Sequence, residues 1–152
     1  MMRNLCRLLA ISILIFCLSA CKKEAKPISI TGKWYITKYS ATGYKNGVEY
    51  APASYSISVS DTGHYYQFNN NGTGIEADYL VDPNYIVVEP SQFNYHITGS
   101  NLILSRPLTL LATTTCTISQ PVANQLVLQG SYTSQSSGDS YKTINEVDLS
   151  KN

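Results

Sequence analysis

The sequence predicts an all-β domain, an antiparallel meander of about eight strands closed into a barrel. After residue 27 the chain consists of short apolar-polar alternations separated by Gly, Asn, Asp and Pro, the pattern of half-buried strands joined by turns. It contains 12 tyrosines, a residue that favours pleated surfaces. No stretch after residue 21 repeats its apolar residues at helical spacing. Closure into a barrel would remove the exposed edges of such a sheet.

The first half of the domain contains five of the expected strands. They are residues 33–40, 44–50, 54–60, 64–69 and 73–81, with the edge of a loop as the alternative for residues 54–60. The first contains Trp34, the only tryptophan, and we expect its indole to plug one end of the barrel. Asn46-Gly47 predicts a tight hairpin turn, and Asn70-Asn71-Gly72 predicts a second turn.

The second half continues the alternation. Its expected strands are residues 85–89, 92–98, 102–104, 113–119, 125–132 and 141–149. Residues expected to face inward are Ile75, Ala77, Tyr79, Phe93, Tyr95, Ile97, Cys116, Ile118, Leu126, Leu128, Tyr132, Val147 and Leu149. Glu76 and His96 are expected to face outward. The serine-rich segment 134–140 is expected to be a loop.

The N-terminus is typical of a signal peptide. Arg3 and Arg7 precede an apolar run over residues 8–20, which is too short to span a membrane. The run ends Leu-Ser-Ala-Cys at Cys21 and resembles the lipobox of bacterial lipoproteins, which implies cleavage before Cys21 and acylation of its thiol. The alternative is an ordinary signal peptide that ends near a cysteine. Two or three acyl chains would anchor the protein to a bilayer.

Processing would divide the chain into three parts. Residues 1–20 are the lipoprotein signal peptide, residues 21–27 a charged flexible tether, and residues 28–152 the barrel domain. Cys116 would then be the only unmodified cysteine, expected as a small buried residue. Removing Arg3 and Arg7 from 11 basic residues leaves nine against 10 acidic ones, a formal charge of −1. This balance argues against nucleic acid as a partner.

Several segments together resemble the lipocalin-like domain of bacterial lipoproteins. They are Gly32-Lys33-Trp34, the turn region 66–74, the segment 93–97 with Leu102, and residues 124–128. The resemblance covers about residues 28–149 and implies a lipocalin-like β-barrel, with Gly32 and Trp34 in structural roles.

The chain departs from that family at three places. In lipocalins an arginine near the last strand stacks on the tryptophan, but the only arginine after residue 20 is Arg106, well before that strand. Lys142 or Lys151 could take its place. The family's T-D-Y element and its C-terminal helix are also missing. The resemblance therefore implies a barrel and no particular ligand.

No motif in the domain indicates catalysis. His64 and His96 stand in no metal-binding spacing, and G-x-S-x-G and phosphate-binding loops are missing. We expect no enzyme, no cofactor and no metal. Aromatic residues are the candidates for ligand binding inside the barrel: Tyr66, Phe68, Tyr79, Phe93, Tyr95 and Tyr132. The alternative, slightly favoured because bulky residues leave little space in an eight-stranded barrel, is that they simply fill it.

Two functions remain open. The first is a lipid-anchored protein of the cell envelope, with the outer membrane favoured, that binds a small apolar or amphipathic ligand in the barrel. It would face the periplasm or the cell surface. The second is an interaction module with a filled barrel. Its loops at 43–53 and 134–140, with Tyr44, Tyr50 and Tyr55, would contact another envelope protein or a glycan.

Overall fold

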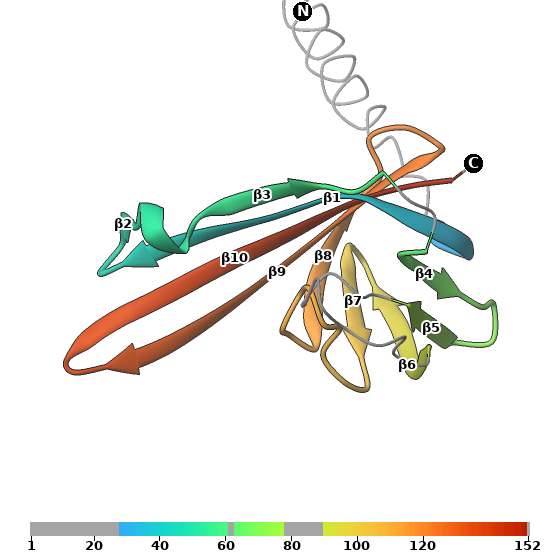
Figure 1. Ribbon diagram of the computed structural model, residues 1–152. Helices are drawn as coiled ribbons and strands as arrows, with labels where there is room; N and C mark the ends of the chain where they lie inside the picture. The colour runs from blue at the N-terminus through green and yellow to red at the C-terminus, as the bar shows by residue number, and fades with distance from the viewer. Residues whose placement is uncertain (1–27, 61–62, 78–89, 152) are drawn as a thin grey trace, which may run out of the picture.

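In the computed structural model, the residues described are 28–60, 63–77 and 90–151; the expected signal peptide, the tether, the strand at 85–89 and Tyr79 lie outside these ranges. The described chain is almost entirely β-structure (Figure 1). Its elements are β1 (Gly32–Lys45), β2 (Val48–Glu49), the 3-10 turn η1 (Ala51–Ala53), β3 (Tyr55–Ser58), β4 (Tyr65–Phe68), β5 (Thr73–Ala77), β6 (Ser91–Thr98), β7 (Asn101–Leu104), β8 (Thr115–Ser119), β9 (Gln125–Ser136) and β10 (Asp139–Ser150).

Eight of these strands close a barrel. From β4 to β10 each strand pairs antiparallel with the next, and β1 joins the two ends by pairing with β4 on one side and β10 on the other. Closure leaves no open edge around the ring. The structure confirms the all-β class, the antiparallel meander and the closed barrel of eight strands.

Three strands are longer than the barrel requires. Residues 32–35 of β1 pair with β4, whereas residues 38–41 pair with β3 and residues 44–45 with β2. Only residues 127–130 of β9 pair with β8, and residues 131–136 continue alongside β10. The four strands in the order β3-β1-β10-β9 therefore project beyond the ring (Figure 1). We call this projection the arm.

A bulge in β1 separates its barrel half from its arm half. The register between β1 and β10 shifts between Ile36 and Lys38. Before the shift Trp34 is buried, and after it Tyr39 and Ala41 are buried. An extra residue in a strand reverses which positions face inward. The inward residues of β1 are therefore even-numbered in the barrel and odd-numbered on the arm, where Tyr39 and Ala41 continue the inner face.

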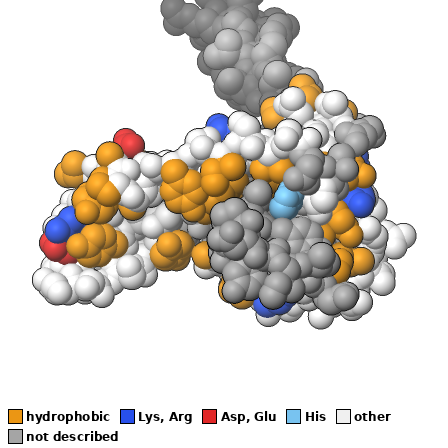
Figure 2. Space-filling model, viewed as in Figure 1, with side chains coloured by type: hydrophobic (Ala, Val, Ile, Leu, Met, Phe, Trp, Pro, Cys, Tyr) orange, Lys and Arg blue, Asp and Glu red, His pale blue; other side chains and the backbone are white. Residues whose placement is uncertain are grey.

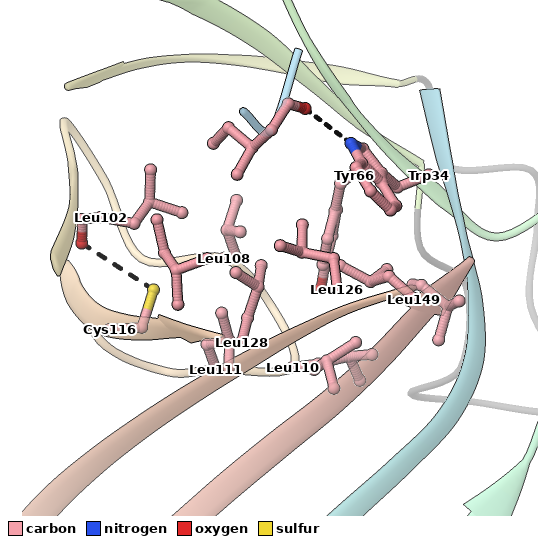
Figure 3. Close-up of a cluster of buried hydrophobic side chains, with 14 of the residues drawn as sticks. Trp34, Tyr66, Leu102, Leu108, Leu110, Leu111, Cys116, Leu126, Leu128 and Leu149 are labelled. Atoms are coloured by element: carbon pink, nitrogen blue, oxygen red, sulfur yellow. Dashed lines mark hydrogen bonds between the residues drawn. The ribbon is translucent and has the colours of Figure 1, made fainter. Parts of the chain in front are cut away.

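Apolar side chains fill the barrel interior (Figure 3). Apart from Tyr39 and Ala41 on the arm, the members of this cluster from the ring strands are each at most 5% exposed: Trp34, Ile36, Tyr66, Phe68, Phe93, Leu102, Leu104, Cys116, Ile118, Leu126, Leu128, Val147 and Leu149. Burying a side chain of this size contributes about 1.5–3 kcal/mol. The expected inward positions of β8 and of the last strand are confirmed.

A leucine-rich connection closes the barrel near the arm. Residues 105–114 join β7 to β8, and Leu108, Leu110 and Leu111 are exposed by only 0%, 4% and 0%. The amides of Leu111 and Ala112 both donate to the Leu108 carbonyl, at 3.1 and 2.9 Å. In Figure 3 these leucines point into the same cluster as Leu126 and Leu128. We call this connection the leucine loop.

The expected orientation of β5 is wrong by one residue. Glu76 is buried opposite Tyr66, while Ile75 is half-buried opposite Gln67. Gly74 also faces inward, and a glycine is needed there because a Cβ would overlap the Phe93 ring. The prediction is therefore wrong for Ile75 and Glu76, whereas Ala77 is buried, at 2% exposure.

The expected loop at 134–140 is also wrong. β9 and β10 stay paired as far as Ser136 and Asp139, and only Ser137-Gly138 turn the chain, with φ of 52° and 86°. Positive φ at both residues suits a two-residue hairpin turn. Serine-rich composition suggested a loop, but serine also alternates regularly along a strand. The predicted turn at Asn46-Gly47 is confirmed, with φ of 49° and 83°.

Candidate functional site

The end of the barrel at which β1 begins is sealed around Trp34. The indole is fully buried, and its Nε1 donates to the Ile30 carbonyl at 2.6 Å (Figure 3). Lys151 lies over the ring with Nζ 4.3 Å from the centroid, and this ammonium also donates to the Thr31 carbonyl at 2.8 Å. Lys151 thus stacks on the tryptophan where lipocalins place an arginine, and of the two lysines considered from the sequence it is the one that does so.

Gly32 makes room for this lysine. Its φ of +119° disfavours other residues, and a Cβ would lie 3.2 Å from Cε and Nζ of Lys151. Gly32, Trp34 and Lys151 therefore form one structural unit at the closed end.

Six residues are predicted from the sequence to bind a ligand inside the barrel, and three of them are buried in its closely packed interior. Tyr66, Phe68 and Phe93 are exposed by 0%, 1% and 3%. Phe68 makes edge contacts with Phe93 and Tyr95, at centroid distances of 5.7 and 5.2 Å. These aromatic contacts stabilise the interior. Ligand binding by these residues stays a prediction.

The remaining two described members of that set lie elsewhere. Tyr95 is half-buried, and its hydroxyl donates to the Asn69 carbonyl at 2.6 Å. Burial raises the pKa of the Tyr95 hydroxyl. Tyr132 is on the same face of β9 as Leu126 and Leu128, but it lies beyond the barrel and is 44% exposed. The expectation that Tyr132 faces the barrel interior is therefore wrong.

An ion pair between a buried carboxylate and a partly exposed guanidinium holds the leucine loop against β5 and β6. Glu76, whose side chain is 3% exposed, accepts from Arg106 Nη1 at 2.6 Å and from the Thr109 amide at 2.6 Å. The guanidinium also donates to Ser91 Oγ and to the Gln92 carbonyl, at 2.6 and 3.0 Å. These bonds offset the cost of burying the carboxylate.

A pocket of about 450 Å³ lies where the arm leaves the barrel, against the leucine loop. We call it the mouth pocket. Its lining residues are Tyr39, Ala41, Ala53, Tyr55, Ile57, Thr109, Leu110, Ala112, Tyr132, Thr143 and Asn145. Its volume is in the range of small-molecule sites. None of these lining residues carries a charge.

Ala41 is a small residue in a row of facing positions that crosses the arm at the mouth pocket. Ala41 pairs with Tyr55 of β3 and Asn145 of β10, and Asn145 pairs with Gly130 of β9. Because Ala41 is small, space remains between Tyr55 and Asn145 on the strands to either side of it. The row is a direct continuation of the inner face of the barrel.

A chain of hydrogen bonds crosses the pocket. The Tyr55 hydroxyl donates to the Tyr39 hydroxyl at 3.0 Å, which donates to Asn145 Oδ1 at 3.3 Å. Asn145 Nδ2 donates to the Leu111 carbonyl at 3.2 Å. The two tyrosine rings also meet edge to face, with centroids 5.5 Å apart. These contacts connect the arm to the leucine loop.

Exposed tyrosines border the pocket on opposite edges of the arm. Tyr55 on β3 is 51% exposed and Tyr132 on β9 is 44% exposed. Three strand spacings separate β3 from β9, which is about 14 Å along the sheet. In Figure 2 hydrophobic side chains gather along the arm. Exposed tyrosines in such a place are good contact residues.

The tip of the arm is cross-linked. Lys45 Nζ lies 2.7 Å from Asp139 Oδ2, and Asn46 Nδ2 donates to Asp139 Oδ1 at 2.8 Å. The Ser140 amide donates to Asn46 Oδ1 at 2.9 Å. Hydrogen bonds from Lys45 and Asn46 lower the pKa of Asp139, and the hydrogen bond to Asp139 raises the pKa of Lys45. The segments proposed as interaction loops thus lie side by side.

The remaining candidates for chemistry are structural. Cys116 is buried, and burial raises its pKa to about 12, so its thiol stays protonated and unreactive. His64 is buried and His96 is exposed on β6, as expected for the latter.

No metal-binding group of three or more His, Cys, Asp or Glu occurs among the residues described. In the same part of the chain, no helix has the length and apolarity needed to cross a membrane.

Sequence reasoning missed most of the mouth pocket. Tyr39 was not assigned to a face, because the bulge after Ile36 cannot be read from alternation. Asn145 could have been found, since it interrupts the apolar alternation of Val147 and Leu149 at an inward position. An amide at such a position indicates a buried polar network or a site.

A small closed β-barrel with a tryptophan sealing one end and a pocket at the other is the architecture of a lipocalin-like domain. A family model described as a lipocalin-like domain matches residues 30–150. The chain belongs to this lipocalin-like domain family. Searches of curated proteins and of solved structures gave no match.

Proposed function

We propose that the protein is a lipid-anchored binding protein of the bacterial cell envelope, held at the outer membrane on its periplasmic or surface face. Acyl chains on Cys21 would hold it to the bilayer, and residues 21–27 would tether the barrel. The Leu-Ser-Ala-Cys sequence that ends the apolar run supports this anchor. The domain acts by binding and not by catalysis.

The anchor is tested by metabolic labelling with a palmitate analogue. Wild-type protein should take up the label and fractionate with membranes, whereas Cys21→Ser should do neither. Cys116→Ser is the matched control and should label like wild type. Label in Cys21→Ser would contradict acylation at this residue.

The ligand is a small amphipathic molecule that binds in the mouth pocket and not inside the barrel. The observation that carries this proposal is the contrast between a barrel filled by side chains and an adjoining 450 Å³ pocket with the small Ala41 in its lining. Such a pocket, with an apolar base and a few convergent polar groups, is the usual form of a small-molecule site.

Variants that fill the pocket test this proposal. Ala41→Leu should block the pocket and weaken ligand binding, whereas Ile103→Leu on β7, outside the pocket lining, should not. A panel of amphipathic molecules screened by ligand-detected NMR would supply the ligand. Saturable binding that is unaffected by Ala41→Leu would place the ligand elsewhere and contradict the proposal.

A second function is contact with another envelope protein through the tip of the arm. Two observations favour it: the cross-linked segments around Asn46 and Asp139, and the exposed Val48 and Tyr50 beside them, at 72% and 41% exposure. Cross-linking in intact cells, with a photoreactive residue at Val48 and a control at Gln120, tests it. A specific adduct from Val48 alone would support it, and identical patterns from both sites would exclude it.

A further inference from the structure

We propose that the mouth pocket binds an uncharged saccharide, with sugar rings against Tyr55 and Tyr132 and hydroxyls bonded to the polar chain that includes Asn145. This inference rests on the proposed function of the same pocket and assigns its ligand class. Three features of the pocket carry it: its lack of charge, its supply of neutral hydrogen-bonding groups, and its bordering aromatic rings.

The uncharged lining disfavours ionic ligands. Among the described residues, no lining side chain is acidic or basic, so a carboxylate or ammonium entering the pocket would lose water without gaining a counter-charge from them. The Lys45–Asp139 ion pair belongs to the tip of the arm and is not part of the lining. A neutral ligand avoids this cost.

The hydrogen-bonding groups suit hydroxyls. Six lining side chains carry a hydroxyl or an amide: Tyr39, Tyr55, Thr109, Tyr132, Thr143 and Asn145. An asparagine amide has two donor hydrogens and two acceptor lone pairs, and the contacts to Tyr39 and Leu111 use one of each. The capacity that remains matches a hydroxyl, which both donates and accepts.

The aromatic rings suit the apolar face of a sugar. A pyranose ring presents C–H groups on its faces and hydroxyls around its rim, so it can stack on an aromatic ring and hydrogen-bond at its edge. Tyr55 is held in place by its edge contact and hydrogen bond to Tyr39, which lowers the entropy lost on binding. The span of about 14 Å between β3 and β9 accommodates an oligosaccharide rather than one sugar.

An acyl chain is a poorer match to the same pocket. It would cover the half-buried Thr143 hydroxyl without offering it a hydrogen bond, and buried unpaired polar groups oppose binding. Apolar ligands also need an enclosed site that buries most of their surface, whereas Tyr55 and Tyr132 are about half exposed. Both the polar groups in the pocket and its open edges therefore favour a saccharide over an acyl chain.

Binding is measured by surface plasmon resonance on the full mature protein, held on a sensor in phosphatidylcholine vesicles, with protein-free vesicles as reference. The probes are cellotriose, maltotriose and chitotriose as neutral saccharides, trigalacturonate as a charged one, and hexanol as an apolar one. At least one neutral trisaccharide should bind saturably, and at least about tenfold more tightly than trigalacturonate, a difference of about 1.4 kcal/mol.

Variants then locate the bound saccharide. Tyr55→Ala and Tyr132→Ala should each weaken its binding about tenfold, the scale of a lost aromatic contact. Tyr50→Ala, an exposed tyrosine of the arm outside the lining, is the matched control and should stay within about twofold, which is under 0.5 kcal/mol. The emission of the buried Trp34 verifies that each variant is folded.

Each other outcome overturns the inference. Hexanol binding that depends on Tyr132, without saccharide binding, would leave the proposed function in place and refute the ligand class. Equal binding of neutral and charged trisaccharides would refute the charge argument. No binding of any probe, or binding insensitive to both tyrosine variants, would refute both the ligand class and the proposed function.

Discussion

The Lys151 ammonium lies 4.3 Å from the centroid of the Trp34 ring and joins the end of the last strand to the beginning of the first. The contact combines a cation–π interaction with a hydrogen bond from the same nitrogen to the Thr31 carbonyl. A lysine thus performs, at the closed end of this barrel, the role for which lipocalins use an arginine.

Removal of the indole should destabilise the domain strongly. Trp34→Ala should cost about 3–5 kcal/mol, because the ring is fully buried and would leave a cavity. Lys151→Ala should cost only about 0.5–1 kcal/mol, the scale of an exposed cation–π contact. Urea unfolding followed by circular dichroism measures both. Equal losses of unfolding free energy in the two variants would contradict the prediction that the buried indole contributes more than the lysine.

The Glu76–Arg106 ion pair predicts a strong dependence of stability on Arg106. Arg106→Ala would leave the Glu76 carboxylate buried without its counter-charge, and we expect a loss of about 2–4 kcal/mol. The double variant Glu76→Gln/Arg106→Ala should lose less than Arg106→Ala alone, because no unpaired charge remains. Thermal unfolding of the set measures the coupling, and strictly additive losses would show that the two residues act independently.

Cys116 should be unreactive in the folded protein. Burial raises its pKa to about 12, so at pH 8 almost none of it is thiolate, the nucleophilic form. A thiol reagent such as Ellman's reagent should react with the mature protein slowly in buffer and rapidly in urea. Cys116→Ser, as the control, should show no reaction in either. Rapid reaction in buffer would mean that this wall of the barrel opens.

The contacts at the tip of the arm should be lost in acid only below the pH at which an ordinary aspartate titrates. Because the pKa of Asp139 is lowered by Lys45 and Asn46, the stability that this carboxylate contributes is present above its ordinary pKa. It is lost as the pH falls through the lowered pKa. NMR shifts of the Asn46 side-chain amide should follow this titration, whereas Asp139→Asn should abolish it. A midpoint at or above the ordinary pKa of aspartate would contradict the observed contacts.

The sequence predicted the topology because barrel strands are encoded by local alternation and turn residues. Trp34, Cys116 and Leu128 all face the interior as their patterns indicate. The arm was not predicted, since nothing local distinguishes a strand that ends with the barrel from one that continues. Local pattern therefore predicts a loop for part of residues 131–136 and an interior position for Tyr132, and both predictions are wrong.

The pocket could not be predicted because it depends on tertiary contacts. The bulge after Ile36 reverses the face of β1 without a local signal. The inward position of Glu76 depends on Arg106, which is 30 residues away in the chain. Alternation predicts which residues share a face of a strand, but it does not predict where the neighbouring strand ends.

The most direct test of the central claim, that ligand binds at the barrel mouth and not in the filled interior, is ¹⁹F NMR with 3-fluorotyrosine placed singly at Tyr132 or at Tyr66. Titration with the best-binding neutral trisaccharide should shift the fluorine signal of residue 132 saturably and leave that of residue 66 unchanged. A saturable shift at residue 66 with none at residue 132 would contradict the account, because it would place the ligand inside the barrel.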